Sequence, residues 1–557
     1  MTSTQPKTFT AEQQAVIAEI QFGTGSLRVE ALAGAAKTTT IEAGVHALDP
    51  SPGEVLAVAF NKRIAEELKE RLPFTCSTAT LNSIGHRAWG GMINRKIQLD
   101  ANKLYHLTTE ALQAARVHED EFIEVGLNVR RLVDGARNVG LIPASSLHPS
   151  MQRPVLEDSW ENWEAIAENM DCDFNEAYLN HARNVLRTSI KRAFEGYIDF
   201  PDQLYMSTCW NATFPQFRTV IVDEAQDLSV LNHHMLARMI APGGRLIAVG
   251  DRFQSIYAFR GASLTSMDLL AGRFKMKTMT LSTTFRCCKA VVEHVKDRVP
   301  HIQAPSWAIE GHVTNLGTDW EVSDILPGSA IICRNNKPLI KLAYRFLKAG
   351  KPVVINGGDF GEVLIKLLKK MAGATSSSEK KNETRLVGMN IGQLMHAIDE
   401  WETKEISDAR AKRKDYRIGS IEDKAGSLRV CVELCKGTNA LEVLQELTQI
   451  FGNKVGTVIL SSGHKSKGLE WETVYHLDSH LCPSRYALRK AEAGDNGALE
   501  QELNLRYVIS TRAKARLLYI DSDREGEKEL DSREDNIHNM DAGNCSSNPN
   551  ELEVNHG

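Results

Sequence analysis

The sequence has few aromatic residues, no long apolar run and no paired cysteine motif. Phe, Trp and Tyr make up 6% of the 557 residues. No apolar stretch approaches about 18 residues, the length expected of a membrane-spanning helix, and the start MTSTQPKTF lacks a signal-peptide core. We therefore expect no membrane contact and a location in the cytoplasm, which would be the host cytoplasm for a phage protein, or in the nucleus for a eukaryotic one.

The ten cysteines are scattered without a C-x-x-C pair. Cys431 and Cys435 lie four residues apart, but two thiols do not supply the four ligands of a structural zinc or iron–sulfur site. This pattern indicates reduced thiols in an intracellular protein.

The chain also lacks the excess of basic residues that is common in nucleic-acid-binding proteins. Its formal net charge is −5, yet the segment from Arg524 to Gly557 holds three basic and nine acidic residues, which leaves the remainder at about +1. We interpret residues 523–557 as an acidic disordered tail. Whole-chain charge therefore says little about the partners of this protein.

An acidic strand end is the most informative motif. The segment VIVDEAQDL (220–228) is a β-branched run that ends in Asp223 and Glu224. Ligand-binding residues gather at the carboxyl ends of buried parallel strands. Asp223 is therefore placed to bind Mg²⁺, and Glu224 to activate a water molecule, as in the hydrolytic half of an ATPase site.

A phosphate-binding loop lies upstream, in SLRVEALAGAAKTTTIEAG. Small residues allow backbone N–H groups to approach phosphate oxygens, Lys37 supplies positive charge, and Thr38 can bind Mg²⁺. A strict G-x-x-x-x-G-K-[ST] motif would have glycine at positions 31 and 36, where this chain has alanine. If position 36 requires a positive φ, Ala36 costs roughly 1 kcal/mol. The residues expected to surround the nucleotide are Ala33, Gly34, Ala35, Ala36, Lys37, Thr38 and Thr39.

Further motifs follow in a fixed order. They are RLIAVGDRFQSIYAFRGA (245–262), LSTTFR (281–286), SSGHKSKGLEWETVYHL (461–477) and QELNLRYVISTRAKARLLYI (501–520). With this series the chain resembles the UvrD/Rep-type superfamily 1 DNA helicases. Within that group, FNKRIAEEL (60–68) and AGAAKTTTI (33–41) are most similar to the F-box DNA helicase branch, without the F-box.

The resemblance implies roles for individual residues in ATP binding and hydrolysis. Gln13 would read the adenine edge, Phe285 would stack on the base, and Glu470 would lie near the ribose. Gln254 would sense the γ-phosphate, while Arg286 and Arg512 would reach it from the second module as arginine fingers.

The resemblance also implies DNA contacts. Tyr257 and Phe259 match aromatic positions among single-stranded bases, where stacking tolerates any sequence, and core packing remains the alternative for both. Asn82 stands where the family has histidine. The residues expected to contact DNA are Asn61, Asn82, Tyr257, Phe259, Arg260 and His464.

The fold implied is α/β, with two RecA-like P-loop NTPase modules that bind ATP between them, each carrying a mostly helical insertion. The predicted first module comprises 1–87 and 209–275, with an insertion at 88–208. The predicted second module comprises 276–360 and 455–522, with an insertion at 361–454.

The function implied is an ATP- and Mg²⁺-dependent DNA helicase that moves 3′→5′ on single-stranded DNA. Its expected partners are single strands, single/double-strand junctions, and a single-strand-binding or recombinase protein. Two alternatives stay open, a translocase that strips proteins from DNA with little unwinding and a nucleic-acid-binding module with a decayed ATPase. A fused nuclease is disfavoured because only about 37 residues follow the last motif.

Overall fold

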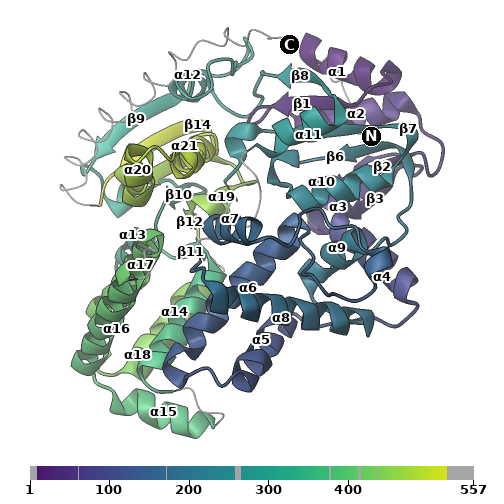
Figure 1. The fold of residues 1–557 in the computed structure, drawn as a ribbon. Helices are drawn as coiled ribbons and strands as arrows, with labels where there is room; N and C mark the ends of the chain where they lie inside the picture. Colours follow the sequence, from purple (N-terminus) through teal and green to yellow (C-terminus); the bar gives the residue numbers. More distant parts are fainter. Residues whose placement is uncertain are drawn as a thin grey trace. The chain divides into compact units, whose positions relative to one another are not determined.

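The computed structural model describes residues 9–59, 62–170, 172–256, 265–374, 378–411, 415–435, 437–453 and 455–522 (Figure 1). These residues form two compact units. The first contains the described residues up to Phe285 together with His301–Gln303, and the second contains Arg286–Pro300 and the described residues from Ala304 onward. Each unit is built around one six-stranded parallel sheet.

The sheet of the first unit has the order β3-β2-β6-β7-β1-β8. Successive strand residues face opposite sides of this sheet, so Val220 and Val222 enter one core while Ile221 enters the other. Continuous apolar runs suit strands that are covered on both faces. The strands are β1 (Leu27–Ala31), β2 (Val55–Ala59), β3 (Ser77–Thr80), β6 (Phe217–Val222), β7 (Ile240–Gly250) and β8 (Lys277–Leu281).

Helices cover both faces of this sheet. On one face lie α1 (Ala11–Phe22), α2 (Lys37–Leu48) and α3 (Lys62–Arg71), which contribute Val16, Ile41 and Leu68 to the core around Ile221. The other face packs against α4 (Leu81–Ile93), α10 (Val230–Met239) and α11 (Ser266–Phe274). Between the two layers the strands run with their carboxyl ends at one edge of the sheet.

The predicted start of the second module at residue 276 was wrong. Strand β8 pairs in parallel with β1 along its whole length, from Lys277 to Leu281. The segment that follows stays with the first unit, because the N–H of Phe285 donates to the carbonyl of Gly34. The apolar pattern of β8 does not reveal which sheet the strand joins. Its pairing with β1 shows that the boundary between the modules lies after β8.

A helical insertion lies between β3 and β6. Its core holds three fully buried tryptophans, Trp89, Trp163 and Trp210. The insertion comprises β4 (Gln98–Leu99), α5 (Lys103–Ala114), α6 (Glu119–Val139), η1 (Pro149–Met151), α7 (Trp160–Met170), α8 (Glu176–Phe194), β5 (Tyr197–Ile198) and α9 (Phe200–Cys209).

The sheet of the second unit has the order β11-β12-β10-β13-β14-β9. Its strands are β9 (His312–Gly317), β10 (Ala330–Cys333), β11 (Val353–Asn356), β12 (Val458–Ser462), β13 (Trp471–Leu477) and β14 (Ala513–Ile520). One hydrophobic core joins β10–β12 to α13 (Asn336–Lys348) and to a helical segment between β11 and β12. That segment contains α14 (Gly358–Met371), α15 (Glu379–Gly388), α16 (Ile391–Ala411), η6 (Asp415–Arg417), α17 (Ile418–Leu434) and α18 (Ala440–Gly452).

The remaining helices of the second unit flank its sheet. They are α12 (Lys289–His294), η5 (Val322–Asp324), α19 (Gly463–Ser466), η7 (Ser479–Leu481), α20 (Arg485–Glu492) and α21 (Gly497–Ser510). Within the described part of the chain, nine cysteines are free thiols, and no helix combines the length and apolarity needed to cross a bilayer.

Candidate functional site

The phosphate-binding loop joins β1 to α2. Gly34 and Ala36 both adopt left-handed backbone conformations, with φ of 75° and 55°. Ala36 is the N-cap of α2 and offers no side-chain hydrogen bond to the helix. The first N–H groups of α2 therefore have no side-chain cap, which leaves the start of the helix suited to an anion. Position 36 therefore has a positive φ, the backbone conformation that explains why the strict motif has glycine there.

Lys37 opens α2 and faces the acidic end of β6. Its Nζ lies 2.9 Å from Oε1 of Glu224. Burial alone would lower the pKa of the Lys37 ammonium. The carboxylates of Glu224, Asp223 and Asp251 outweigh burial and raise that pKa above its ordinary value. The lysine therefore carries a full positive charge at neutral pH.

The two carboxylates at the end of β6 are held differently. Asp223 is 9% exposed, and its Oδ1 accepts the N–H of Glu224 at 2.9 Å. Burial and the neighbouring Glu224 raise the pKa of Asp223 to about 6. Glu224 has a φ of 53°, which turns the chain at the end of the strand. A non-glycine residue in this conformation is uncommon and is often found at functional sites.

Sequence reasoning missed two members of this site, Gln226 and Asp251. Gln226 is 1% exposed and donates from Nε2 to Oε2 of Glu224 at 2.5 Å, while its Oε1 accepts the N–H of Asp251 at 3.2 Å. A Cβ at Gly250 would lie 2.3 Å from that Oε1, so a larger residue there would push the Gln226 amide out of this position. The signal was available, because RLIAVGD ends in a carboxylate just as VIVDE does.

Asp251 holds Gln254, the residue expected to sense the γ-phosphate. Nε2 of Gln254 donates to Oδ2 of Asp251 at 2.7 Å, and the N–H of Phe253 donates to Oδ1. Burial raises the pKa of Asp251, which is 1% exposed. Residues from the ends of β1, β6 and β7 thus form one polar cluster at the carboxyl edge of the first sheet.

The residues expected to hold the base lie beside the same loop. Nε2 of Gln13 donates to Oγ1 of Thr40 in α2, while its Oε1 accepts the N–H of Thr10. Phe285 is 36% exposed, and its N–H donates to the carbonyl of Gly34 at 2.8 Å. The contacts of these two side chains with adenine stay predictions.

The loop residues Ala33 and Ala35 are buried, whereas Thr38 and Thr39 are half-buried in the first turn of α2. Mg²⁺ prefers oxygen ligands, and the Thr38 hydroxyl with the Asp223 carboxylate is a donor set of that kind. The cluster around Lys37 has three carboxylates and one ammonium group. This excess of negative charge fits a site that receives a divalent cation.

In the second unit, Arg286 and Glu470 form an ion pair. Nε of Arg286 lies 2.7 Å from Oε2 of Glu470, and Nζ of Lys514 lies 2.9 Å from the other carboxylate oxygen. Burial alone would raise the pKa of Glu470, but Lys514 and Arg286 together lower it. Lys514 is a basic residue of this group that sequence reasoning did not single out.

Arg512 differs from Arg286 because its guanidinium group is buried. The side chain is 1% exposed, with Nε donating to the carbonyl of Val508 at 2.8 Å and Nη1 to that of Leu469 at 3.1 Å. In this arrangement Arg512 ties α21 to the loop before β13. Its role as an arginine finger stays a prediction. To contact a phosphate, the guanidinium group would have to give up its hydrogen bonds to the two backbone carbonyls.

The residues expected to contact DNA divide into two sets. Asn61, Tyr257, Phe259 and Arg260 lie outside the described residues. Asn82 is half-buried, and its Nδ2 donates to the carbonyl of Phe200 at 3.1 Å and to Oε1 of Gln203 at 3.0 Å. Its amide therefore joins α4 to α9 of the insertion.

His464 lies in α19, just after β12, and is half-buried. The DNA contacts of His464 and Asn82 stay predictions.

Comparison with known proteins gives the chain a family. The UvrD/REP helicase N-terminal domain matches residues 9–275, and the UvrD-like helicase C-terminal domain matches residues 354–524. The chain belongs to the UvrD/Rep helicase family. The matched regions contain Lys37, Asp223 and Glu224 in the first unit and Glu470 and Arg512 in the second.

Individual relatives in this family have low sequence identity to this chain, but they align with most of its length. F-box DNA helicase protein 1 of Schizosaccharomyces pombe is 23% identical over 93% of this chain, and F-box DNA helicase 1 of Gallus gallus is 24% identical over 88%. The ATP-dependent DNA helicase UvrD2 of Mycobacterium tuberculosis is 23% identical over 88% of the chain and is covered over 76% of its length. The chain spans only 58% and 47% of the two F-box helicases.

Proposed function

We propose that this protein is an ATP-dependent DNA helicase or translocase that moves 3′→5′ on single-stranded DNA. The main support is the polar cluster at the carboxyl edge of the first sheet, where Lys37 faces Glu224, Asp223 and Asp251. Membership of the UvrD/Rep family and the names of its relatives support DNA as the substrate. Polarity rests on the resemblance of HKSKGLEW and NLRYVISTRAKA to the 3′→5′ branch.

The hydrolytic step would proceed from the ion pair between Lys37 and Glu224. ATP phosphates would occupy the start of α2 and draw Lys37 away from Glu224, which frees that carboxylate to orient and deprotonate a water molecule. Gln226 holds one oxygen of Glu224 and would keep its other oxygen directed towards the water. Mg²⁺, held by Thr38 and Asp223, would neutralise charge on the phosphates.

Coupling to DNA would require the second unit. Arg286 is held by Glu470 at its surface, and an ATP γ-phosphate would compete with that carboxylate for the guanidinium group. Arg286 would thus exchange Glu470 for the γ-phosphate, and Arg512 would exchange its backbone carbonyls for it in the same way. These exchanges would link hydrolysis to movement of one module against the other. Single strands and strand junctions are the proposed substrates, with a single-strand-binding or recombinase protein as a partner.

The deciding experiment measures ATP hydrolysis with single-stranded DNA, duplex DNA, RNA or no nucleic acid, and then unwinding of duplexes with 3′ or 5′ overhangs. We expect hydrolysis to be stimulated most by single-stranded DNA and unwinding to require a 3′ overhang, ATP and Mg²⁺. Higher salt should inhibit loading, because binding to the DNA backbone releases counterions.

Other outcomes identify the alternatives. Unwinding from 5′ overhangs would contradict the polarity. DNA-stimulated hydrolysis without unwinding of either substrate would favour a translocase that strips proteins, to be checked by displacement of a DNA-bound protein. DNA binding without any hydrolysis would indicate a decayed ATPase and contradict the proposal.

A further inference from the structure

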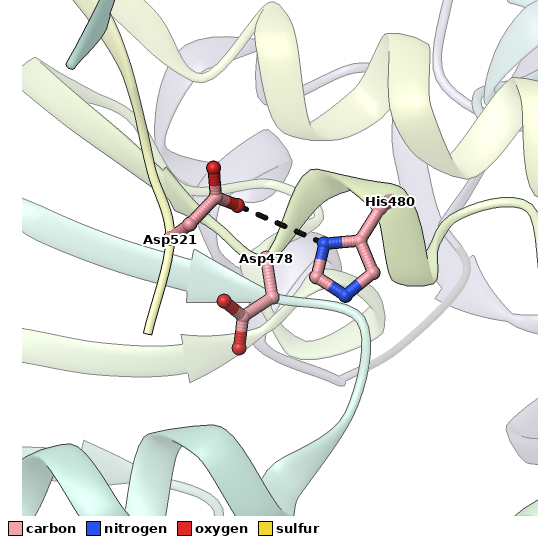
Figure 2. Close-up of side chains that lie close together, drawn as sticks. All are labelled: Asp478, His480 and Asp521. Carbon is pink, nitrogen blue, oxygen red and sulfur yellow. Dashed lines mark ion pairs between the residues drawn. The ribbon is translucent and has the colours of Figure 1, made fainter. Parts of the chain in front are cut away.

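A second polar cluster lies in the second unit, at the carboxyl ends of β13 and β14. Asp478 directly follows β13, Asp521 directly follows β14, and His480 lies in η7 (Figure 2). Because the two strands are neighbours in a parallel sheet, their ends lie together, and the N–H of Asp478 donates to the carbonyl of Ile520 at 2.9 Å. Ligand sites form at such strand ends in open α/β sheets.

All three side chains are buried and converge. Asp478 is 3% exposed, Asp521 4% and His480 8%, and one potential metal-binding atom from each lies within 4.8 Å of the others. Ligand atoms at about 2.0–2.2 Å from one ion lie roughly 3.0–3.6 Å apart in tetrahedral or cis-octahedral geometry, so binding would draw these atoms together by about one ångström. Figure 2 shows the Asp521 carboxylate directed towards the imidazole of His480.

The two carboxylates lack the cationic partners that buried acids normally have. Among the residues that the structure describes, the Asp521 carboxylate accepts no hydrogen bond, and its one ion-pair partner is Nδ1 of His480 at 3.7 Å. That distance is too long for a hydrogen bond. Asp478 accepts hydrogen bonds from the N–H and hydroxyl of Ser522 at 2.7 and 2.9 Å, and no lysine or arginine of the described chain pairs with either acid. Buried charges that are neither paired nor hydrogen-bonded are costly unless they bind metal.

We propose that Asp478, His480 and Asp521 bind one divalent transition-metal ion of the Mn²⁺ or Zn²⁺ class. One imidazole nitrogen and two carboxylate oxygens suit these ions better than Ca²⁺ or Mg²⁺, which favour oxygen ligands alone. The hydrogen bonds from Ser522 would orient the Asp478 carboxylate, as outer contacts commonly do for metal ligands.

The ion would link the carboxyl ends of β13 and β14. The amino ends of these two strands lie next to residues that are predicted to contact the nucleotide. Strand β13 starts just after Glu470, β14 starts just after Arg512, and the N–H of Trp471 donates to the carbonyl of Arg512 at 3.0 Å. The site would be distinct from the Mg²⁺–ATP site, because all of its ligands belong to the second unit and lie at the opposite ends of these strands. Its expected role is structural.

The first test uses the full chain without nucleotide, after removal of metals with a chelator that is then dialysed away. Mn²⁺ is titrated and free Mn²⁺ is followed by electron paramagnetic resonance. We expect one bound ion per chain and an increase in the melting temperature on binding. Co²⁺ in place of Mn²⁺ should give a spectrum of nitrogen and oxygen ligands without a thiolate charge-transfer band.

Shape-preserving variants then locate the ion. Asp521→Asn and His480→Gln should each weaken Mn²⁺ binding by at least about tenfold and abolish the metal-dependent rise in melting temperature. His396→Gln is the matched control, because His396 forms an exposed pair with Glu400 at 3.2 Å and should leave binding unchanged. Circular dichroism checks that each variant is folded.

Absence of a bound ion in the unmodified protein would overturn the proposal, whatever the variants do. Binding that is equally tight in folded Asp521→Asn and His480→Gln would overturn it as well, as would a thiolate band with Co²⁺.

Discussion

The first unit contains two buried clusters of basic and acidic side chains that differ in charge balance. In the helical insertion, Lys103 and Arg137 face Asp199 and Asp202, with distances of 2.5 to 3.0 Å between the paired atoms. The four side chains are 0 to 5% exposed, and the two cations balance the two buried acids, while the exposed Asp134 pairs with Arg137 from outside at 2.6 Å. At the edge of the sheet, one ammonium group faces three carboxylates. We call these the insertion cluster and the sheet-edge cluster.

The difference separates a structural network from a binding site. Nζ of Lys103 also donates to the carbonyl of Ser189, so the insertion cluster is well supplied with partners. Burial alone would raise the pKa of Asp202, yet Lys103 and Arg137 keep it below its ordinary value, whereas burial and the neighbouring Asp202 raise the pKa of Asp199 to about 6. In the sheet-edge cluster, burial and Glu224 raise the pKa of Asp223 to about 6 as well, so the two clusters differ in the number of cations that face the acids and not in this shift. Excess negative charge makes that cluster less favourable by itself and receptive to a cation.

The largest expected effect is on hydrolysis, in the sheet-edge cluster. Glu224→Gln preserves shape but removes the base, so DNA-stimulated ATP hydrolysis should fall by roughly 100- to 10,000-fold while ATP binding is retained. A steady-state ATPase assay and a fluorescent-nucleotide titration measure the two properties. Glu66→Gln changes an exposed glutamate of the same unit and serves as control. Near-normal turnover of Glu224→Gln would contradict the proposed base.

A substitution in the insertion cluster should lower the stability of the protein and leave ATP hydrolysis nearly unchanged. Lys103→Met leaves Asp202 buried without its ammonium partner and should lower the free energy of unfolding by about 3–5 kcal/mol. Hydrolysis per folded molecule should stay within about twofold of the unmodified protein. Urea unfolding followed by circular dichroism measures the stability, and an ATPase assay on the folded fraction measures the activity.

A second substitution tests the cause. Lys103→Met combined with Asp202→Asn removes both charges and should regain part of the lost stability. If the double variant is no more stable than Lys103→Met, loss of packing rather than an unpaired charge explains the effect.

Asp223→Asn should separate stability from function. Because folding raises the pKa of this carboxyl from about 3.9 to about 6, the folded state binds more protons than the unfolded state between those values. The native carboxylate therefore costs stability at pH 7, and this cost disappears as the pH falls through 6 towards 4. The variant should be more stable than the unmodified protein by about 1–3 kcal/mol at pH 7, and equal to it near pH 4.

Unfolding of both proteins at several pH values, in Mg²⁺-free buffer, measures this difference. The variant should also lose ATP hydrolysis. A stability difference that does not change between pH 4 and 7 would rule out the raised pKa as its cause.

The smallest effect is expected at Ala36. Ala36→Gly relieves the left-handed strain, but glycine also gains freedom in the unfolded chain, so the free energy of unfolding should change by less than about 1 kcal/mol. The kcat/KM for ATP should change by less than about tenfold. ATPase kinetics and thermal unfolding check both values. An increase from almost no activity would instead show that alanine had disabled the loop.

Most of the sheet-edge cluster could be predicted from local sequence. The apolar run before Asp223 and the small residues before Lys37 each indicate a strand followed by a polar turn, and both turns lie at the same edge of the sheet. Asp251 follows the same kind of run, yet its place in the cluster depends on Gln226, whose two hydrogen bonds appear only in three dimensions.

The other predictions were less complete because they depend on contacts between segments that are distant in the sequence. β8 could have joined either sheet by its composition, and its pairing with β1 placed it in the first unit. The DNA contact expected of Asn82 stays a prediction, and the sequence did not indicate that Phe200 and Gln203, more than 100 residues away, accept its amide hydrogens. Asp478 and Asp521 lie 43 residues apart in the chain and meet because β13 and β14 are neighbours.

The sequence by itself determined the chemistry of the two units, because strand ends, the phosphate loop and the motif order are local patterns of residue type. Tertiary structure alone decided which charges are buried, which are balanced and which distant carboxylates share one site. The physical reason is that the free energy of a charge depends on its surroundings, and those surroundings come from segments that are remote in the chain.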